Sequence, residues 1–196
     1  MILLIDDDTA FSYTLLSILE DNAPSVFVAS SKTDFHKIID LSLKGIIITT
    51  DKDNNFLANL IKASAPEIPI LGIGLGHLAI CKIYGGNICM ATKPTNGKVS
   101  HIYHDGNGIY KNMPNPFTAT RYDASNIVKN SLPKFLKTVS YSDNGEIMGI
   151  RHLLYPLETI QFNPVSIMTC GGEQIIHNFL DFINLSQNRP AFLRFL

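Results

Sequence analysis

A glycine-rich segment in the middle of the chain has the pattern of a turn that presents a reactive side chain. Apolar residues before it predict a strand, Gly72-Ile73-Gly74-Leu75-Gly76-His77 predicts a sharp turn, and the residues up to Tyr84 predict a helix. Such an elbow exposes one side chain at its apex and directs backbone N–H groups toward an oxyanion. The apex here is Gly74, which has no side chain. On spacing alone, close packing explains the glycines better than catalysis does.

A second set of residues that could do chemistry is acidic. Asp6, Asp7 and Asp8 follow the first predicted strand, and Asp51 follows the third. These carboxylates resemble the pocket of a phosphoacceptor receiver domain, where clustered carboxylates hold Mg²⁺. Solvated loop residues explain them more simply, because the chain after Ile70 matches no receiver pattern. A receiver-like acidic-pocket module therefore stays an alternative, and we predict neither a metal site nor a cofactor.

The three cysteines are poor candidates for catalysis or metal binding. Cys81, Cys89 and Cys170 are odd in number and lack metal-ligand spacing, which argues against a disulfide framework and a zinc site. Cys81 lies seven residues past Gly74, two helical turns along the same face. We therefore predict that Cys81 is buried and is not a relocated nucleophile, and the other two have no better claim.

The elements that must position these residues alternate in the first half of the chain. Short apolar runs and amphipathic stretches predict βαβ units and a parallel sheet. The predicted strands are Ile2–Ile5, Val26–Ala29, Gly45–Thr49 and Ile68–Ile73, and the helices between them are Ala10–Glu20, capped by Thr9, Thr33–Leu41 and Phe56–Ala63.

The second half is predicted to be rich in β-structure. Frequent turn signals divide it, and Asn144-Gly145 favours a tight hairpin. A strand near Thr159–Phe162 and a helix near Glu173–Leu185 close the chain. The predicted fold is therefore α/β and three-layered, with a mostly parallel central sheet, flanking helices and a β-rich second half.

Length and composition fit a single compact domain. The chain has 196 residues, 45% of them hydrophobic, so we expect one domain over residues 1–196. Its 16 Lys and Arg against 17 Asp and Glu argue against disorder and nucleic-acid binding. No apolar run approaches the ~18 residues of a membrane span, and no basic leader precedes Asp6. We therefore expect a soluble, cytoplasmic protein with no nucleic-acid or membrane partner.

Ordered motifs over nearly the whole chain resemble one enzyme family. The chain is similar to class I, triad-type glutamine amidotransferases, closest to the glutaminase component of anthranilate and aminodeoxychorismate synthases. The matching segments are Leu3-Leu4-Ile5-Asp6 with Phe11 and Tyr13, Pro69–Gly72 with Leu75-Gly76-His77, Gly97-Lys98, His104-Asp105-Gly106, Pro114–Phe117, Ala119–Tyr122, Ile147–His152, Gln161-Phe162 with Pro164 and Ser166, and Asn178-Phe179-Leu180. The resemblance implies a flavodoxin-like fold.

The resemblance also implies that the catalytic residues are missing. The family has a cysteine nucleophile where this chain has Gly74, and its Gln-Phe-His-Pro-Glu motif here reads Gln161-Phe162-Asn163-Pro164-Val165. Glycine has no side chain, an amide accepts no proton near neutral pH, and valine cannot orient a base. We predict no functional catalytic residue at Gly74, Asn163 or Val165.

The pocket around the elbow departs from the family as well. The family's glycine-proline-glycine oxyanion loop aligns with Thr49–Asp53, where a carboxylate would repel an oxyanion. The positions predicted to form this degenerate oxyanion and glutamine pocket are Thr50, Asp51, Lys52, Leu75, Leu78, Asp123, Ala124 and Ser125. In the family pattern His77 is structural, and a local turn or ion pair explains His104-Asp105 and Arg151-His152.

These departures from the family pattern favour a catalytically silent protein. We predict a binding, regulatory or scaffold subunit that associates with a chorismate-using synthase component I or with a copy of itself. The competing hypothesis is an active glutaminase or hydrolase with rewired groups near Asp51, Asp123 or Ser166. Ammonia release from glutamine discriminates the two.

Overall fold

Apolar runs of the first half form a buried parallel sheet. The computed structural model describes residues 1–188. Strands β1 (Ile2–Ile5), β3 (Gly45–Ile48) and β4 (Ile70–Ile73) are buried along their whole length. Strand β2 (Val26–Ala29) adds to one side and β9 (Leu157–Ile160) to the other, and all neighbouring pairs are parallel. Their Ile, Leu and Val residues suit a sheet covered on both faces.

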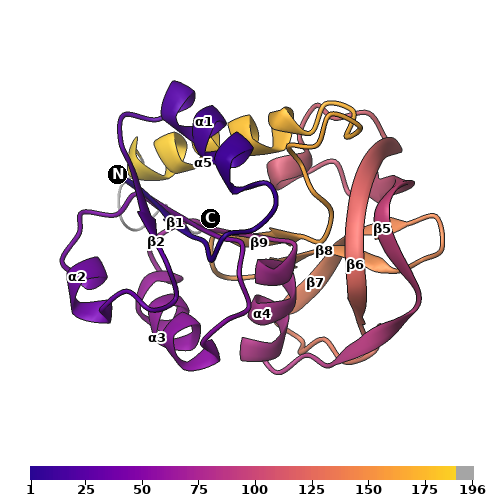
Figure 1. Ribbon diagram of the computed structural model, residues 1–196, viewed down its shortest axis with the longest axis horizontal. Helices are drawn as coiled ribbons and strands as arrows, with labels where there is room; N and C mark the ends of the chain where they lie inside the picture. Colours follow the sequence, from indigo (N-terminus) through magenta and orange to yellow (C-terminus); the bar gives the residue numbers. More distant parts are fainter. Residues whose placement is uncertain (189–196) are drawn as a thin grey trace.

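Helices cover both faces and complete the three layers (Figure 1). Helices α1 (Ser12–Asn22) and α5 (Glu173–Asn188) lie together on one face, where Leu15, Leu19 and Phe179 enter the core. Helices α2 (Phe35–Ile39), α3 (Asn54–Ser64) and α4 (Leu75–Ile83) cover the other face. Among residues 1–188, no helix is long and apolar enough to span a membrane.

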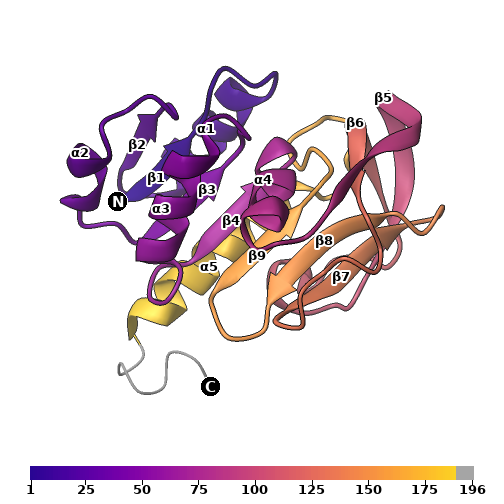
Figure 2. The same cartoon turned by 90° about the horizontal axis from the view of Figure 1, so that it is seen from below.

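The second half extends the same sheet with antiparallel strands. These are β5 (Ile88–His104), β6 (Phe117–Ile127), β7 (Leu136–Ser142) and β8 (Ile147–His152), with a short 3₁₀ turn at Gly108–Tyr110. The strand order is β2-β1-β3-β4-β9-β8-β7-β5-β6. Figure 2 shows the long β5–β6 pair curling away from the parallel core. The α/β fold with a parallel core and a β-rich second half is confirmed.

Element boundaries differ from the predictions where side chains have other partners. Thr9 does not cap the first helix, which begins at Ser12 after Phe11 and has no side-chain cap. The hydroxyl groups of Thr9 and Ser12 instead donate to the carboxylate of Asp6. The hairpin at Asn144-Gly145 is confirmed, with Gly145 at φ +72° between β7 and β8. The last strand ends at Ile160, which leaves Gln161 and Phe162 in the following loop.

Candidate functional site

The elbow has the geometry that the sequence predicts. Strand β4 ends at Ile73, and Gly74 turns the chain into α4 with φ +60° and ψ −111°. The N–H of Gly74 donates to the carbonyl of Ile160 at 2.8 Å, which fixes the turn against β9. Gly76 serves a different purpose, because a Cβ there would lie 1.9 Å from the carbonyl oxygen of Ile48. Close helix–sheet packing therefore requires Gly76, and backbone conformation favours glycine at position 74.

His77 holds the elbow from inside the protein. Its side chain is fully buried, and Nδ1 lies 2.6 Å from the hydroxyl of Thr159 on β9. Burial lowers the pKa of His77 to about 3, so the ring is neutral at physiological pH. The structural role predicted for His77 is consistent with this geometry.

A pocket of about 330 Å³ lies beside the elbow, between α4, β6 and the start of α1. Of the predicted positions it brings together Gly74, Asn163, Asp51, Leu75, Leu78, Ala124 and Ser125. Its other lining residues are Thr9, Ala10, Phe11, Thr49, Lys82, Ile88, Tyr122, Gln161 and Phe162. The walls combine aromatic and aliphatic side chains with several polar ones.

The pocket lining leaves out four predicted positions, which are Thr50, Lys52, Asp123 and Val165. Thr50 is buried, and its hydroxyl accepts the backbone N–H of Lys52. Val165 packs against the core cluster under α1 and α5. The prediction that Asp123 lines the pocket is wrong. Side chains alternate along β6, so that of Asp123 points away from the face that carries Ala124.

The side chain of Asn163 is held by its own loop. Its Oδ1 accepts the N–H of Val165 at 3.0 Å, and its backbone carbonyl accepts the Thr169 hydroxyl at 2.7 Å. The N–H of Asn163 donates to the carbonyl of Thr120 on β6. The amide therefore stabilises a turn at the pocket wall, where it has no capacity to take a proton.

Asp123 belongs to a buried ionic network that sequence reasoning missed. Arg121, only 2% exposed, donates from Nε to Asp123 at 2.6 Å and pairs through Nη2 with Glu146 at 2.6 Å. Gln161 donates to the second oxygen of Asp123 at 3.3 Å. The network ties β6 to the β7–β8 hairpin. The available sequence signal is the pair of opposite charges at positions 121 and 123, because alternate residues of a strand share one face.

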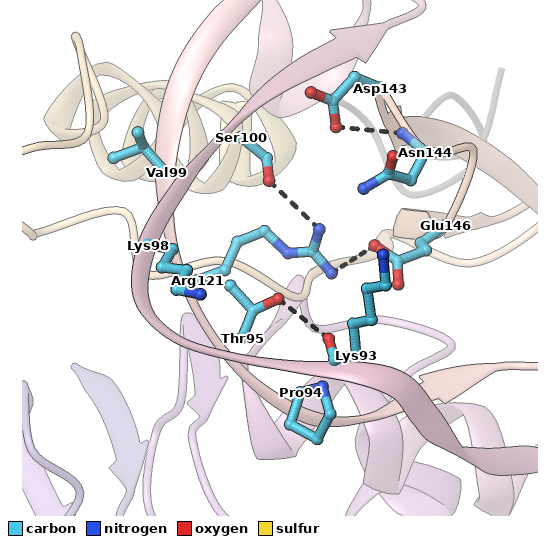
Figure 3. Close-up of a pocket in the computed structure, with 10 residues that line it drawn as sticks. All are labelled: Lys93, Pro94, Thr95, Lys98, Val99, Ser100, Arg121, Asp143, Asn144 and Glu146. Atoms are coloured by element: carbon cyan, nitrogen blue, oxygen red, sulfur yellow. Dashed lines mark hydrogen bonds and ion pairs between the residues drawn. The ribbon is translucent and has the colours of Figure 1, made fainter.

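Arg121 also forms the floor of a second hollow, of about 580 Å³, which lies between strand β5 and the turn that joins β7 to β8 (Figure 3). Lys93 and Lys98 stand at its edge, while Glu146 reaches in from the hairpin. Ser100 accepts from Nη1 of Arg121 at 3.3 Å. Cations and carboxylates are mixed around this hollow, so it has no single dominant sign of charge.

Asp6 and Asp7, at the end of β1, accept hydrogen bonds from the protein itself. Burial alone would raise the pKa of Asp6, but hydrogen bonds from Ser12, Thr49 and Thr9 lower it below its ordinary value. Asp7 accepts both the N–H and the hydroxyl of Ser31. Within residues 1–188, no group of three or more His, Cys, Asp or Glu side chains is arranged to hold a metal ion. The receiver-like alternative gains no support from this geometry.

None of the cysteines approaches the elbow pocket. Cys81 is fully buried, as predicted, and burial raises the pKa of its thiol to about 11. Cys89 and Cys170 are exposed and do not contribute to the pocket lining. The thiolate needed for nucleophilic attack is therefore not supplied by Cys81.

The motifs around residues 104 and 151 stabilise the loop that follows β5, at residues 105–107. Arg151 pairs with Asp105 at 2.7 Å and with Glu158 at 2.8 Å. His104 contacts the carbonyl of Pro114 through Nε2 at 2.9 Å. The predicted turn and ion-pair roles are confirmed.

Comparisons with known proteins agree with this architecture. Residues 3–182 match the family described as glutamine amidotransferase class-I. Anthranilate synthase component 2 of Cyanophora paradoxa is 41% identical over 190 residues, covering 94% of this chain and all of the relative. Aminodeoxychorismate synthase component 2 of Escherichia coli (strain K12) is 36% identical over 185 residues, covering 92% and 99% of the two chains.

A solved structure shows the same fold at low sequence identity. It is described as a putative GMP synthase protein from Thermoplasma acidophilum, and it superposes with a TM-score of 0.85 at 19% identity, covering 95% of this chain and 94% of that one. With a family match that spans most of the sequence, this chain belongs to the class I glutamine amidotransferases.

Proposed function

We propose that this chain is a class I amidotransferase subunit without glutaminase chemistry, which serves as a binding or regulatory component of a chorismate-using synthase. The proposal rests on the two side-chain types found at the elbow and beside it in the pocket. Gly74 occupies the apex of the turn at φ +60°, and the amide of Asn163 lines the same pocket. Neither can attack a carbonyl carbon or accept a proton near neutral pH.

The rest of the pocket supports a silent site. Asp51 lines the wall next to the α4 N-terminus, where a developing oxyanion would meet a negative charge. Leu78 adds an aliphatic side chain one turn further along α4.

The rewired-enzyme alternative is less well supported by the same geometry. Asp123 is buried against Arg121, away from the pocket. Ser166 does not line the elbow pocket, and its hydroxyl accepts the N–H of Met168. Only Asp51 of the three remains in the pocket. The lining, as described within residues 1–188, offers hydroxyl groups but neither a histidine nor a cysteine, so an activated nucleophile–base pair of the usual kind is missing there.

The partner follows from the names of the relatives. They are second components of anthranilate and aminodeoxychorismate synthases, and this chain covers nearly their whole length. A first component of such a synthase is therefore the partner that we propose, and a second copy of this chain is the alternative.

The test uses the full purified chain in two assays. Ammonia release from glutamine is measured with and without the first component from the same host, and an active component 2 serves as the positive control. Complex formation is measured by native mass spectrometry on the same samples. We expect no ammonia above the buffer control and a stable heteromeric complex. Sustained ammonia release would refute the silent site, and a chain that stays monomeric beside the first component would refute the subunit role.

A further inference from the structure

The elbow pocket is a slot that runs along one side of α4. Its lining includes Gly74 and Leu75 at the start of α4 and Lys82 in the last turn of that helix. Leu75 and Lys82 are seven residues apart on the helix, which corresponds to about 10 Å along its axis at ~1.5 Å per residue. The pocket therefore has the length to hold an extended small molecule rather than a compact one.

Much of the slot's lining is apolar. Phe11, Leu78, Tyr122 and Phe162 line it from four different segments. Tyr122 is 55% exposed and Leu75 is 45% exposed, so apolar surface remains open to water at the mouth. Large exposed apolar side chains around a hollow are typical of a surface that something else covers.

The two ends carry opposite charges that the protein leaves unpaired. Asp51 lies near the α4 N-terminus, because β3 and β4 are parallel neighbours and Ile48 is in register with Gly72. Lys82 lies in the last turn of α4. Across residues 1–188, neither side chain forms an ion pair or a side-chain hydrogen bond.

The helix dipole reduces these charges without reversing them. A helix terminus is equivalent to roughly half an elementary charge, positive at the N-terminus and negative at the C-terminus. Asp51 carries a full negative charge beside the positive end, and Lys82 a full positive charge beside the negative end. The Asp51 end therefore stays net negative and the Lys82 end net positive.

From this arrangement we infer that the slot binds a small amphipathic amino acid whose ammonium and carboxylate groups sit at opposite ends of an apolar spacer. The ammonium would lie at Asp51, the carboxylate at Lys82, and the spacer along Phe11, Leu78 and Phe162. This inference rests on the proposed function, because a pocket that hydrolyses glutamine would be organised around a nucleophile at position 74. It assigns the silent pocket a ligand class that differs from glutamine, whose two charges share one carbon atom.

The test is a set of linear probes measured by isothermal titration calorimetry with the full chain. The probes are 6-aminohexanoate, the shorter 4-aminobutanoate, hexanoate, hexylamine and glutamine. We expect 6-aminohexanoate to bind more tightly than each of the others, because it alone places both charges at the ends of the slot. Removing one partly exposed ion pair should weaken binding by up to about fivefold.

Two variants and a control identify the ends. Asp51→Asn should weaken 6-aminohexanoate and leave hexanoate unchanged, while Lys82→Gln should weaken 6-aminohexanoate and leave hexylamine unchanged. Lys93→Gln, at the edge of the other hollow, is the matched control and should change neither.

Each outcome separates this inference from the proposed function. If the chain releases no ammonia and binds the first component, but binds glutamine as tightly as 6-aminohexanoate or binds no probe, the ligand class is wrong and the silent subunit stands. Equal affinities in wild type and both end variants would also overturn the ligand class. If the chain hydrolyses glutamine, both inferences are wrong.

Discussion

Replacing Gly74 with cysteine introduces a thiol at the elbow but not the groups that would activate it. An ideal Cβ at position 74 meets no atom nearer than 4.0 Å, where the Gln161 carbonyl oxygen and the Phe11 ring lie. The side chain therefore fits. The cost comes from the backbone, because φ +60° with ψ −111° is a strained region for any residue but glycine and costs about 1–3 kcal/mol.

The chemical gain from the same change is small. Without a histidine partner the new thiol has a pKa of ~8.5, so a few per cent is thiolate at neutral pH unless the α4 N-terminus lowers that pKa. Asn163 can neither take the thiol proton nor deliver one to the departing ammonia. Members of a triad act as a unit, and losing one costs on the order of 10⁴ to 10⁶ in rate. Gly74→Cys should therefore release ammonia at the background rate.

The assay separates strain from chemistry. Gly74→Ala is the control for strain, and it should lower the free energy of unfolding as much as Gly74→Cys does. The triple variant Gly74→Cys, Asn163→His, Val165→Glu should form more thiolate yet stay slow until the Thr50–Asp53 loop is rebuilt. Iodoacetamide labelling followed by mass spectrometry reports the thiolate, and ammonia release reports turnover. Brisk turnover by Gly74→Cys alone would mean that a base survives in the pocket and that the reasoning is wrong.

Three further predictions concern the framework around the site. Gly76→Ala should destabilise the fold by about 3 kcal/mol in urea titration, because its Cβ would overlap the Ile48 carbonyl, and a loss smaller than about 1 kcal/mol would contradict the packing. The pKa of His77 is about 3 in the folded chain and 6.5 in the unfolded chain. His77 therefore does not change the free energy of unfolding above pH 6.5, and it lowers that free energy by about 1.4 kcal/mol per pH unit as the pH falls from 6.5 toward 3. In His77→Gln this slope should become shallower, with His152 still contributing in the same direction because burial lowers the pKa of that residue too. Arg121→Met strands two carboxylates without their cation and should cost about 3–5 kcal/mol, whereas an unchanged denaturation midpoint would show that the ion pairs contribute nothing.

Local sequence signals predicted the parts of the site that depend on backbone geometry. Glycine spacing located the elbow, and the seven-residue offset from Gly74 placed Cys81 in the core. The Asn-Gly pair located the hairpin after β7. Each of these depends on residues close together in the chain, so the pattern itself contains the information.

Sequence signals failed where a charged group binds a side chain that the residue pattern assigns to another role. Asp123 aligned with a pocket position, but strand alternation and the buried guanidinium of Arg121 draw its carboxylate to the opposite face. Thr9 has the residue type of an N-cap, yet Asp6 at the end of β1 takes its hydroxyl and the helix begins later. In both cases a charged partner only two or three residues away decides the position of the side chain, and residue type alone does not predict that pairing.

The shape of the elbow does not depend on a reactive group at its apex. Its shape depends on the positive φ of Gly74, the contact of Gly76 with β3 and the hydrogen bond between His77 and Thr159. None of these contacts involves a nucleophile, a base or an oxyanion donor. A change of side chain at the apex or at Asn163 therefore leaves the turn, the helix and the slot beside it in place. Because the scaffold does not depend on the reactive groups, the presence of the elbow is not by itself a sign of activity, and the groups at positions 74 and 163 decide what the pocket can do.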